Sequence, residues 1–184
     1  MDVAISSNKR LCNSNIVLNK NDCLPHISLL MGCLSFDKLE RAQSMLKVIG
    51  SQHNAMKLYI PGIRTVNTPA GDVITLDIAP NEDLQQLHES VVNAFSPLIS
   101  TDATDDDVLE AQRASGSTLD WINNFITQSS FKNFWPHITI GYLKESGISE
   151  QIEPLSFTTS RLAICHLGNY CTCKVILKET SLCA

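Results

Sequence analysis

The feature that most constrains the fold is a five-residue pattern that occurs twice. Residues 25–29 read Pro-His-Ile-Ser-Leu and residues 136–140 read Pro-His-Ile-Thr-Ile, so both copies are Pro-His-aliphatic-hydroxyl-aliphatic. Alternate residues of a β-strand point to opposite faces. In a strand, each copy would present one imidazole and one hydroxyl on one face and two aliphatic side chains to a core. The pattern therefore predicts two equivalent, half-buried strands.

The sequence around each copy predicts further regular structure. The first copy lies in the apolar tract Leu24–Leu34, which we expect to form a buried strand. A helix should follow, capped by Ser35 and stopped at Gly50, with an apolar stripe at i, i+3, i+7 and i+10. Two strands are then expected at Met56–Ile63 and Val73–Ala79, joined by a turn over Arg64–Asp72.

The second part of the chain repeats this order. A helix should begin at Asn81, and a shorter one should be capped by Thr118. Between them, Ser96–Ser117 is acidic and predicts a solvated loop or a lid, with a helix possible over Val108–Arg113. After the predicted strand Trp135–Leu143, two more are expected, joined by a hairpin turn at Gly168-Asn169: Phe157–Leu167 and Cys171–Thr180.

The repeated order of elements indicates an α+β fold built from two similar lobes. The chain has 184 residues, which suits one domain, so we expect a single domain over 1–184 with lobes at about 24–95 and 118–182. No run of eighteen apolar residues or secretory signal is visible, and the seven cysteines then indicate reduced thiols and a cytoplasmic protein. The net charge of −5 favours a nucleotide or short RNA over long nucleic acid as the partner.

The paired motifs predict acid–base chemistry at a phosphate. Imidazole has an unperturbed pKa of about 6.5, so it both accepts and donates protons near neutral pH. His26 and His137 would serve as the catalytic pair, and either one could be the base. Ser28 and Thr139 would bind the non-bridging phosphate oxygens, where negative charge collects. We expect no metal ion and no other cofactor, because the chain shows no carboxylate cluster of the kind that two-metal sites use.

A zinc site is the one metal-binding alternative that the sequence offers. Cys165, His166, Cys171 and Cys173 lie close together in the sequence. However, they include no Cys-x-x-Cys pair, and free cysteine is among the residue types most often buried. Burial is therefore the favoured interpretation of these cysteines.

The two His-x-Ser/Thr segments, 111 positions apart, resemble those of the 2H phosphoesterase superfamily, and more closely its 2′-5′ RNA ligase-like and cyclic phosphodiesterase branch. The resemblance covers about Leu24 to Leu182. It implies a bilobal, pseudo-twofold α+β fold, with two antiparallel sheets flanking a central cleft and helices outside. It implies that His26 and His137 are catalytic and that Ser28 and Thr139 bind phosphate. It also implies that Tyr142, five positions after the second histidine, lines the cleft; the matching position after the first is Met31.

Strand alternation alone places Tyr142 opposite His137, unless the strand ends or bulges near Gly141. Residues of less certain role complete the set of candidates. For the aromatic side chains of Phe131, Phe134 and Trp135, stacking on a base and packing in the core are the two alternatives. His88 is expected to be exposed. The cationic side chains that could contact phosphate are Lys57, Arg64, Arg113 and Lys144.

The sequence therefore predicts a monomeric, metal-independent hydrolase of RNA processing that opens 2′,3′-cyclic phosphates. Two alternatives stay open: a 2′-5′ oligonucleotide phosphodiesterase or 2′-5′ RNA ligase, and a nucleotide-binding module without turnover. Product analysis separates the predicted hydrolase from the 2′-5′ phosphodiesterase. Hydrolysis of a cyclic phosphate leaves a monoester, whereas attack by a ribose hydroxyl on a 2′-5′ linkage leaves a cyclic end.

Overall fold

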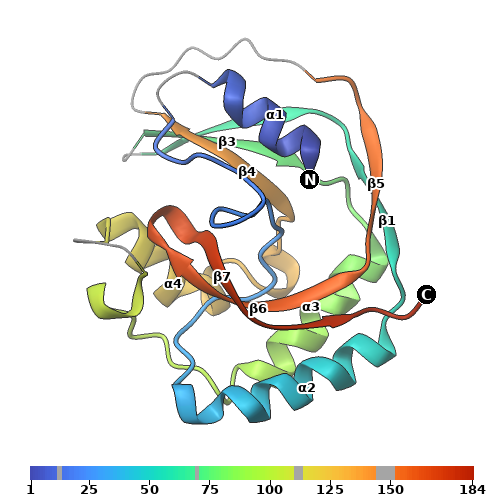
Figure 1. Cartoon of the computed structure of the whole chain (residues 1–184), viewed down its shortest axis with the longest axis vertical. Helices are drawn as coiled ribbons and strands as arrows, with labels where there is room; N and C mark the ends of the chain where they lie inside the picture. Colours follow the sequence, from blue (N-terminus) through green and yellow to red (C-terminus); the bar gives the residue numbers. More distant parts are fainter. Residues whose placement is uncertain (12–13, 69–70, 110–113, 144–151) are drawn as a thin grey trace.

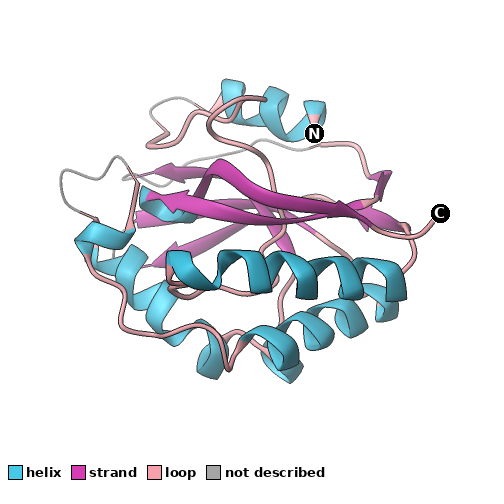
Figure 2. Cartoon of the chain, turned by 60° about the horizontal axis from the view of Figure 1, so that its bottom comes forward, coloured by secondary structure: helices cyan, strands magenta, loops and turns pink. Residues whose placement is uncertain are grey.

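The computed structural model describes residues 1–11, 14–68, 71–109, 114–143 and 152–184. Its four α-helices and seven strands confirm the α+β class (Figure 1). Figure 2 shows the strands as a layer, with the N-terminal helix on one side and the other helices on the opposite side. The helices are α1 (Asp2–Arg10), α2 (Leu39–Gln52), α3 (Glu82–Phe95) and α4 (Gly116–Gln128); the strands are β1 (Met56–Ile60), β2 (Ile63–Thr68), β3 (Gly71–Asp77), β4 (His137–Leu143), β5 (Leu155–Thr159), β6 (Arg161–Gly168) and β7 (Thr172–Ser181).

Every strand pair within the three sheets is antiparallel, as expected. The sheets have the orders β2-β3-β4, β1-β5 and β6-β7. Strand β4, which carries His137, pairs with β3 from the first half of the chain. Conversely, Leu24 forms an isolated bridge with Cys173 in β7. Residues of the range 24–95 thus pair with residues of the range 118–182. Strands from the two halves of the chain are therefore hydrogen-bonded to each other.

The helices bury the apolar stripes that the sequence predicts. In α3, Asn81 caps the helix, since its Oδ1 accepts a hydrogen bond from the Leu84 amide at 2.8 Å. The α4 helix begins two residues before the predicted Thr118 cap, because Ser115 takes that role. The buried stripe of α2 is Leu39, Ala42, Leu46 and Ile49, and that of α3 is Leu84, Leu87, Val91 and Phe95.

Gly50 does not stop α2, contrary to the expectation. The helix continues to Gln52, and Gly50 lies inside it against β7. A Cβ at Gly50 would come within 2.8 Å of the Ser181 carbonyl oxygen, which is too close for any side chain without a shift of backbone. Glycine is needed here for close packing of helix on strand.

The assignment of strands was wrong in three places. The predicted turn over Arg64–Asp72 includes most of β2, whose polar, β-branched residues form a largely exposed strand of the β2-β3 hairpin. The predicted strand Phe157–Leu167 is divided at Ser160 into β5 and β6, which pair with different partners. The tract Leu24–Leu34 is not a strand and forms only isolated bridges, at Leu24 and Cys33. The predicted hairpin is confirmed, but its turn is Asn169–Cys171, since Gly168 is the last residue of β6 and pairs with Thr172.

Candidate active site

His137 opens strand β4 and is fixed by residues on both sides of it. Its Nδ1 lies 2.9 Å from the Trp135 carbonyl oxygen, and the two rings stack with their centroids 4.3 Å apart. A carbonyl can only accept, so Nδ1 carries the hydrogen and Nε2 is the nitrogen that gains or loses a proton. Across the sheet, His137 faces Asp77 of β3. The ring is therefore held in one orientation and one tautomer.

A β-bulge in β4 decides where Tyr142 points. Thr75 pairs with Thr139 and Ile74 pairs with Gly141, so Ile140 is an extra residue without a partner across the sheet. Ile140 and Gly141 are both buried in succession, whereas His137, Thr139 and Tyr142 are all half-buried. The bulge thus breaks the alternation and brings Tyr142 to the face of His137 and Thr139. A side-chain hydrogen bond joins Tyr142 to Thr139.

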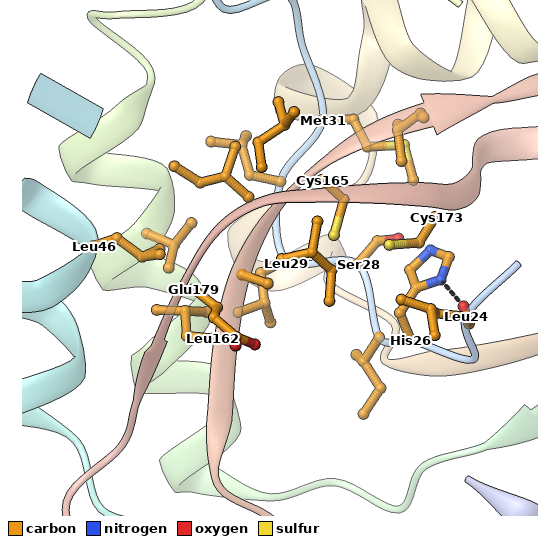
Figure 3. A pocket seen from close by; sticks show the side chains of 18 of the residues that line it. Leu24, His26, Ser28, Leu29, Met31, Leu46, Leu162, Cys165, Cys173 and Glu179 are labelled. Carbon is orange, nitrogen blue, oxygen red and sulfur yellow. Dashed lines mark hydrogen bonds between the residues drawn. The ribbon is translucent and has the colours of Figure 1, made fainter. Parts of the chain in front are cut away.

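His26 is held in the same way on a segment of different structure. Its Nδ1 lies 2.8 Å from the carbonyl oxygen of Leu24, two residues earlier, as His137 relates to Trp135 (Figure 3). A second backbone hydrogen bond links the ring to Cys171, in the turn between β6 and β7. Both motif histidines therefore use the same local device, with Nε2 as the titrating nitrogen in each.

Contacts around the turn between β6 and β7 connect the two motifs. Cys171 contacts His26 as described, and the adjacent Tyr170 packs on Tyr142 with the ring centroids 4.8 Å apart. Tyr142 in turn is bonded to Thr139, on the face of His137. The two imidazoles are also close enough for charge on His26 to lower the pKa of His137. The structure thus brings both histidines and Thr139 into one neighbourhood.

Tyr170 and Cys171 have positive φ angles of 58° and 54°, which non-glycine residues rarely adopt. The contacts of Asn169 hold this turn in place. Its Oδ1 accepts hydrogen bonds from the Thr118 hydroxyl at 2.8 Å and from the Ser115 amide at 3.0 Å, both at the start of α4. The strained backbone is therefore fixed by α4 where it meets His26 and Tyr142.

Ser28 lies on a cavity of about 790 Å³ that borders the first motif. His26, Ser28, Cys165 and Cys173 are among the residues that line it (Figure 3). His137, Thr139 and Tyr142 do not line this cavity. Ser28 is thus near His26 and half-buried. The cavity reaches Ile138 of the second motif and extends toward β6 and the helices α2 and α3.

Burial lowers the pKa of both motif histidines below the ordinary value for imidazole. For His26, desolvation dominates, and the backbone hydrogen bonds to Leu24 and Cys171 partly oppose it. For His137, desolvation is again the largest cause, and the Trp135 carbonyl opposes it. The neutral form of each ring is favoured, which suits the one that must accept a proton.

An ion pair between Arg64 and Asp77 lies beside His137, and the sequence did not predict this pairing. The Nε of Arg64 lies 2.7 Å from Oδ2 of Asp77, and the Arg64 guanidinium lies over the Trp135 ring, 5.2 Å from its centroid. The negative Asp77 raises the pKa of His137 and the positive Arg64 lowers it. Arg64 was one of four candidate cations, but Asp77 carried no sequence signal because its role depends on the register of β3 with β4. Arg113 and Lys144 lie outside the described residues.

His88 was expected to be exposed, but it is fully buried at 0% exposure. Its Nδ1 donates to the Leu29 carbonyl oxygen at 2.8 Å, and its Nε2 accepts from the Phe131 amide at 2.9 Å. The ring also stacks on Phe134, with centroids 3.9 Å apart. His88 on α3 thus connects the segment after His26 to the segment before His137. Phe134 packs in this contact, and Phe131 is 40% exposed.

The described part of Ser96–Ser117 lies beside the cavity. Asp106 and Asp107 line it, and the Leu109 amide donates to the Leu167 carbonyl at 2.9 Å. The predicted helix over Val108–Arg113 falls mostly outside the described residues. In the described ranges, no three His, Cys, Asp or Glu side chains gather in a way that could hold a metal ion, so the cysteines near His166 gain no support as a zinc site.

Comparisons with known proteins identify the family and the fold of the chain. The family model of the 2′-5′ RNA ligase superfamily matches residues 19–169. Among solved structures, the chain is similar to TT0787 of Thermus thermophilus, with a TM-score of 0.61 and 14% identity, over 98% of this chain and 90% of that one. No curated protein matches. None of the helices described is long and apolar enough to cross a membrane. With the family match over most of its length, the chain belongs to the 2′-5′ RNA ligase superfamily, the 2H phosphoesterases.

Proposed function

We propose that the protein hydrolyses 2′,3′-cyclic phosphates of nucleotides or RNA ends by paired-histidine catalysis. The proposal rests on one observation: the two imidazoles make the same hydrogen bond from Nδ1. Each donates from Nδ1 to a carbonyl two residues earlier, so in each ring Nε2 is the nitrogen that gains or loses a proton. Their electrostatic coupling supports action on one shared group.

The proposed reaction needs one neutral and one protonated histidine. The neutral ring removes a proton from water, whose oxygen forms a new bond to phosphorus. The protonated ring gives its proton to the ribose oxygen as the bond from that oxygen to phosphorus breaks. Ser28 and Thr139 donate hydrogen bonds to the non-bridging oxygens, and Tyr142 orients the Thr139 hydroxyl and lines the substrate site. The product is a phosphate monoester.

Among the cations in the described residues, Arg64 is the one placed next to His137, where it can assist substrate binding. It influences His137 electrostatically, and its side chain is 57% exposed even though it pairs with Asp77. A positive group at this position favours an anionic substrate next to His137. The substrate is then a nucleotide or a short RNA end, in keeping with the net charge of −5.

The test is a substrate panel run in the presence of EDTA. It contains the four nucleoside 2′,3′-cyclic phosphates, ADP-ribose cyclic phosphate and 2′-5′ dinucleotides, with a His26→Ala/His137→Ala double variant as control. We expect a monoester product from the cyclic nucleotides with the wild type only. A cyclic end from 2′-5′ dinucleotides would instead identify transesterification. Tight nucleotide binding without turnover at any pH would overturn the proposal.

A further inference from the structure

The N-terminal helix α1 lies outside the range matched by the family model and packs on strand β4. Its residue Asn8 is 4% exposed, although it is polar. The side-chain Nδ2 donates to the Ile140 carbonyl at 2.7 Å and to the Ile16 carbonyl at 3.0 Å, and Oδ1 accepts from the Leu18 amide at 2.8 Å. A buried amide with three such bonds is a specific connector between α1, the segment after it and β4.

The contact with Ile140 falls on the bulge that redirects Tyr142. Ile140 is the extra residue of β4, and it is completely buried. A bulge disrupts the ladder locally, so the backbone groups of the extra residue need partners from elsewhere. Asn8 supplies one to the Ile140 carbonyl. The short distance of 2.7 Å and the burial indicate that this bond stabilises the bulged form of the strand.

The rest of the N-terminal segment reinforces the same position. The Asn15 amide donates to the Tyr142 carbonyl at 3.0 Å. At Gly141, a Cβ would lie 2.5 Å from Cδ1 of Leu11, so only glycine allows this approach without a shift. Together with Asn8, these residues contact three consecutive positions of β4 at the bulge.

We propose that Asn8 is a positioning residue for the active site, which acts by holding the Ile140 bulge and so keeps Tyr142 beside Thr139. The inference rests on the proposed function for its catalytic consequence. In a regular strand, Tyr142 would point away from His137, and its hydrogen bond to Thr139 would be lost. The N-terminal helix thus contributes to a site whose other members lie within the family range.

The first experiment measures the position of Tyr142 without any reaction. The chain has three tyrosines, so labelling with 3-fluorotyrosine gives three ¹⁹F signals, and Tyr142→Phe assigns the one of interest. We expect Asn8→Asp to shift the Tyr142 signal, because it keeps an acceptor for Leu18 and loses both donors. The neighbouring exposed Lys9→Ala is the matched control and should leave the signal unchanged. Gly141→Ala, which disturbs the bulge from Leu11, is the second variant if Asn8→Asp does not fold.

The second experiment is a double-mutant cycle on the cyclic nucleotide that is turned over best. Asn8→Asp should reduce kcat/KM about tenfold, since misplacing a group by about 1 Å costs up to about a hundredfold. In the Tyr142→Phe background, Asn8→Asp should reduce it by less than about twofold. Effects that multiply in the double variant, or an unshifted Tyr142 signal in a folded Asn8→Asp protein, would overturn the inference. A shifted signal in a protein without turnover would refute the proposed function alone.

Discussion

The two copies of the motif have nearly the same sequence but different structural support. The copy around His137 forms strand β4, which pairs along its length with β3. The copy around His26 has no such ladder: the segment 24–34 is held by bridges from Leu24 and Cys33 and by His88. Yet each histidine donates from Nδ1 to the carbonyl two residues before it. The motif thus specifies local side-chain geometry, and the surrounding chain supplies the backbone support separately.

The two histidines also differ in their electrostatic surroundings. His137 has the Asp77–Arg64 ion pair and the Trp135 ring beside it. The pKa of His26 is set by burial and by two backbone hydrogen bonds. The two histidines therefore share the Nδ1 hydrogen bond to the carbonyl two residues earlier, but they differ in the second backbone bond of His26 and in the charges beside His137. At His137, the charges of Asp77 and Arg64 act on the pKa in addition to burial and the hydrogen bond to Trp135.

The largest expected effect tests the symmetric part of the comparison. His26→Ala and His137→Ala should each lower kcat by several hundredfold or more, given the usual acid–base contribution of about 10²–10⁴. The measurement is initial-rate kinetics on a cyclic nucleotide, with His53→Ala as the control, since His53 hydrogen-bonds Ser90 away from the site. Wild-type activity in either motif variant would refute a shared catalytic pair.

A large effect on stability is expected where the two segments are joined. His88→Phe keeps a ring on Phe134 but removes the bonds to Leu29 and Phe131, which should cost about 2–5 kcal/mol because two buried groups lose partners. Urea unfolding measures this.

The pH dependence gives a second test of His88. Burial lowers the pKa of His88, so the unfolded chain binds the proton first and wild-type stability should fall as the pH drops below about 6.5. The His88→Phe variant should show a smaller fall. An unchanged dependence on pH would contradict the neutral, two-bond state of His88.

The hydroxyls should show an intermediate effect and reveal whether the motifs contribute equally. We expect Ser28→Ala and Thr139→Val each to reduce kcat/KM by about tenfold to a hundredfold. This is below the largest losses, about a thousandfold, that removal of one oxyanion-hole donor causes in other enzymes. Thr139 is additionally bonded to Tyr142, so Tyr142→Phe should reproduce part of the Thr139→Val loss. A large loss for one hydroxyl and none for the other would show that only one motif binds the phosphate.

The smallest effect concerns the asymmetry of charge. Asp77→Asn removes a negative group that raises the pKa of His137, so the pKa should fall further; Arg64→Gln should raise it. NMR titration of the His137 ring measures both, with the His26 ring as an internal reference. Shifts of the same sign in the two variants would contradict the opposing roles of this ion pair.

The sequence located the two histidine segments that the structure brings close together, but it located the strands that support them less well. The candidates His26, Ser28, His137 and Thr139 come from two copies of a five-residue pattern, because side-chain direction in a strand is a local property. The helices at α2 and α3 were found because their apolar stripes have a clear period. The exposed strand β2 was missed because polar residues gave no such period.

Other features depend on contacts that are distant in sequence. Asp77 faces His137 only through the β3-β4 register, and the bulge at Ile140 follows from the same pairing. Asn8 and His88 bond to partners 132 and 59 positions away. The helix α1 was not predicted, and its Asn8 contacts make sense only once β4 is in place. These features could not be predicted from the single sequence because they depend on pairing between residues that are far apart in the chain, not on local preferences.

The crossing of the chain halves has a consequence for biosynthesis. Leu24 emerges from the ribosome early, but the strand residue that it bridges, Cys173, is made about 150 positions later. Likewise β3 must wait for β4. At elongation rates of about 5–20 residues per second, the first motif stays without its partner for about 7 to 30 seconds. The nascent protein therefore cannot form the bridge that holds the first motif before nearly the whole chain has been translated, and a product truncated before Cys173 would lack it.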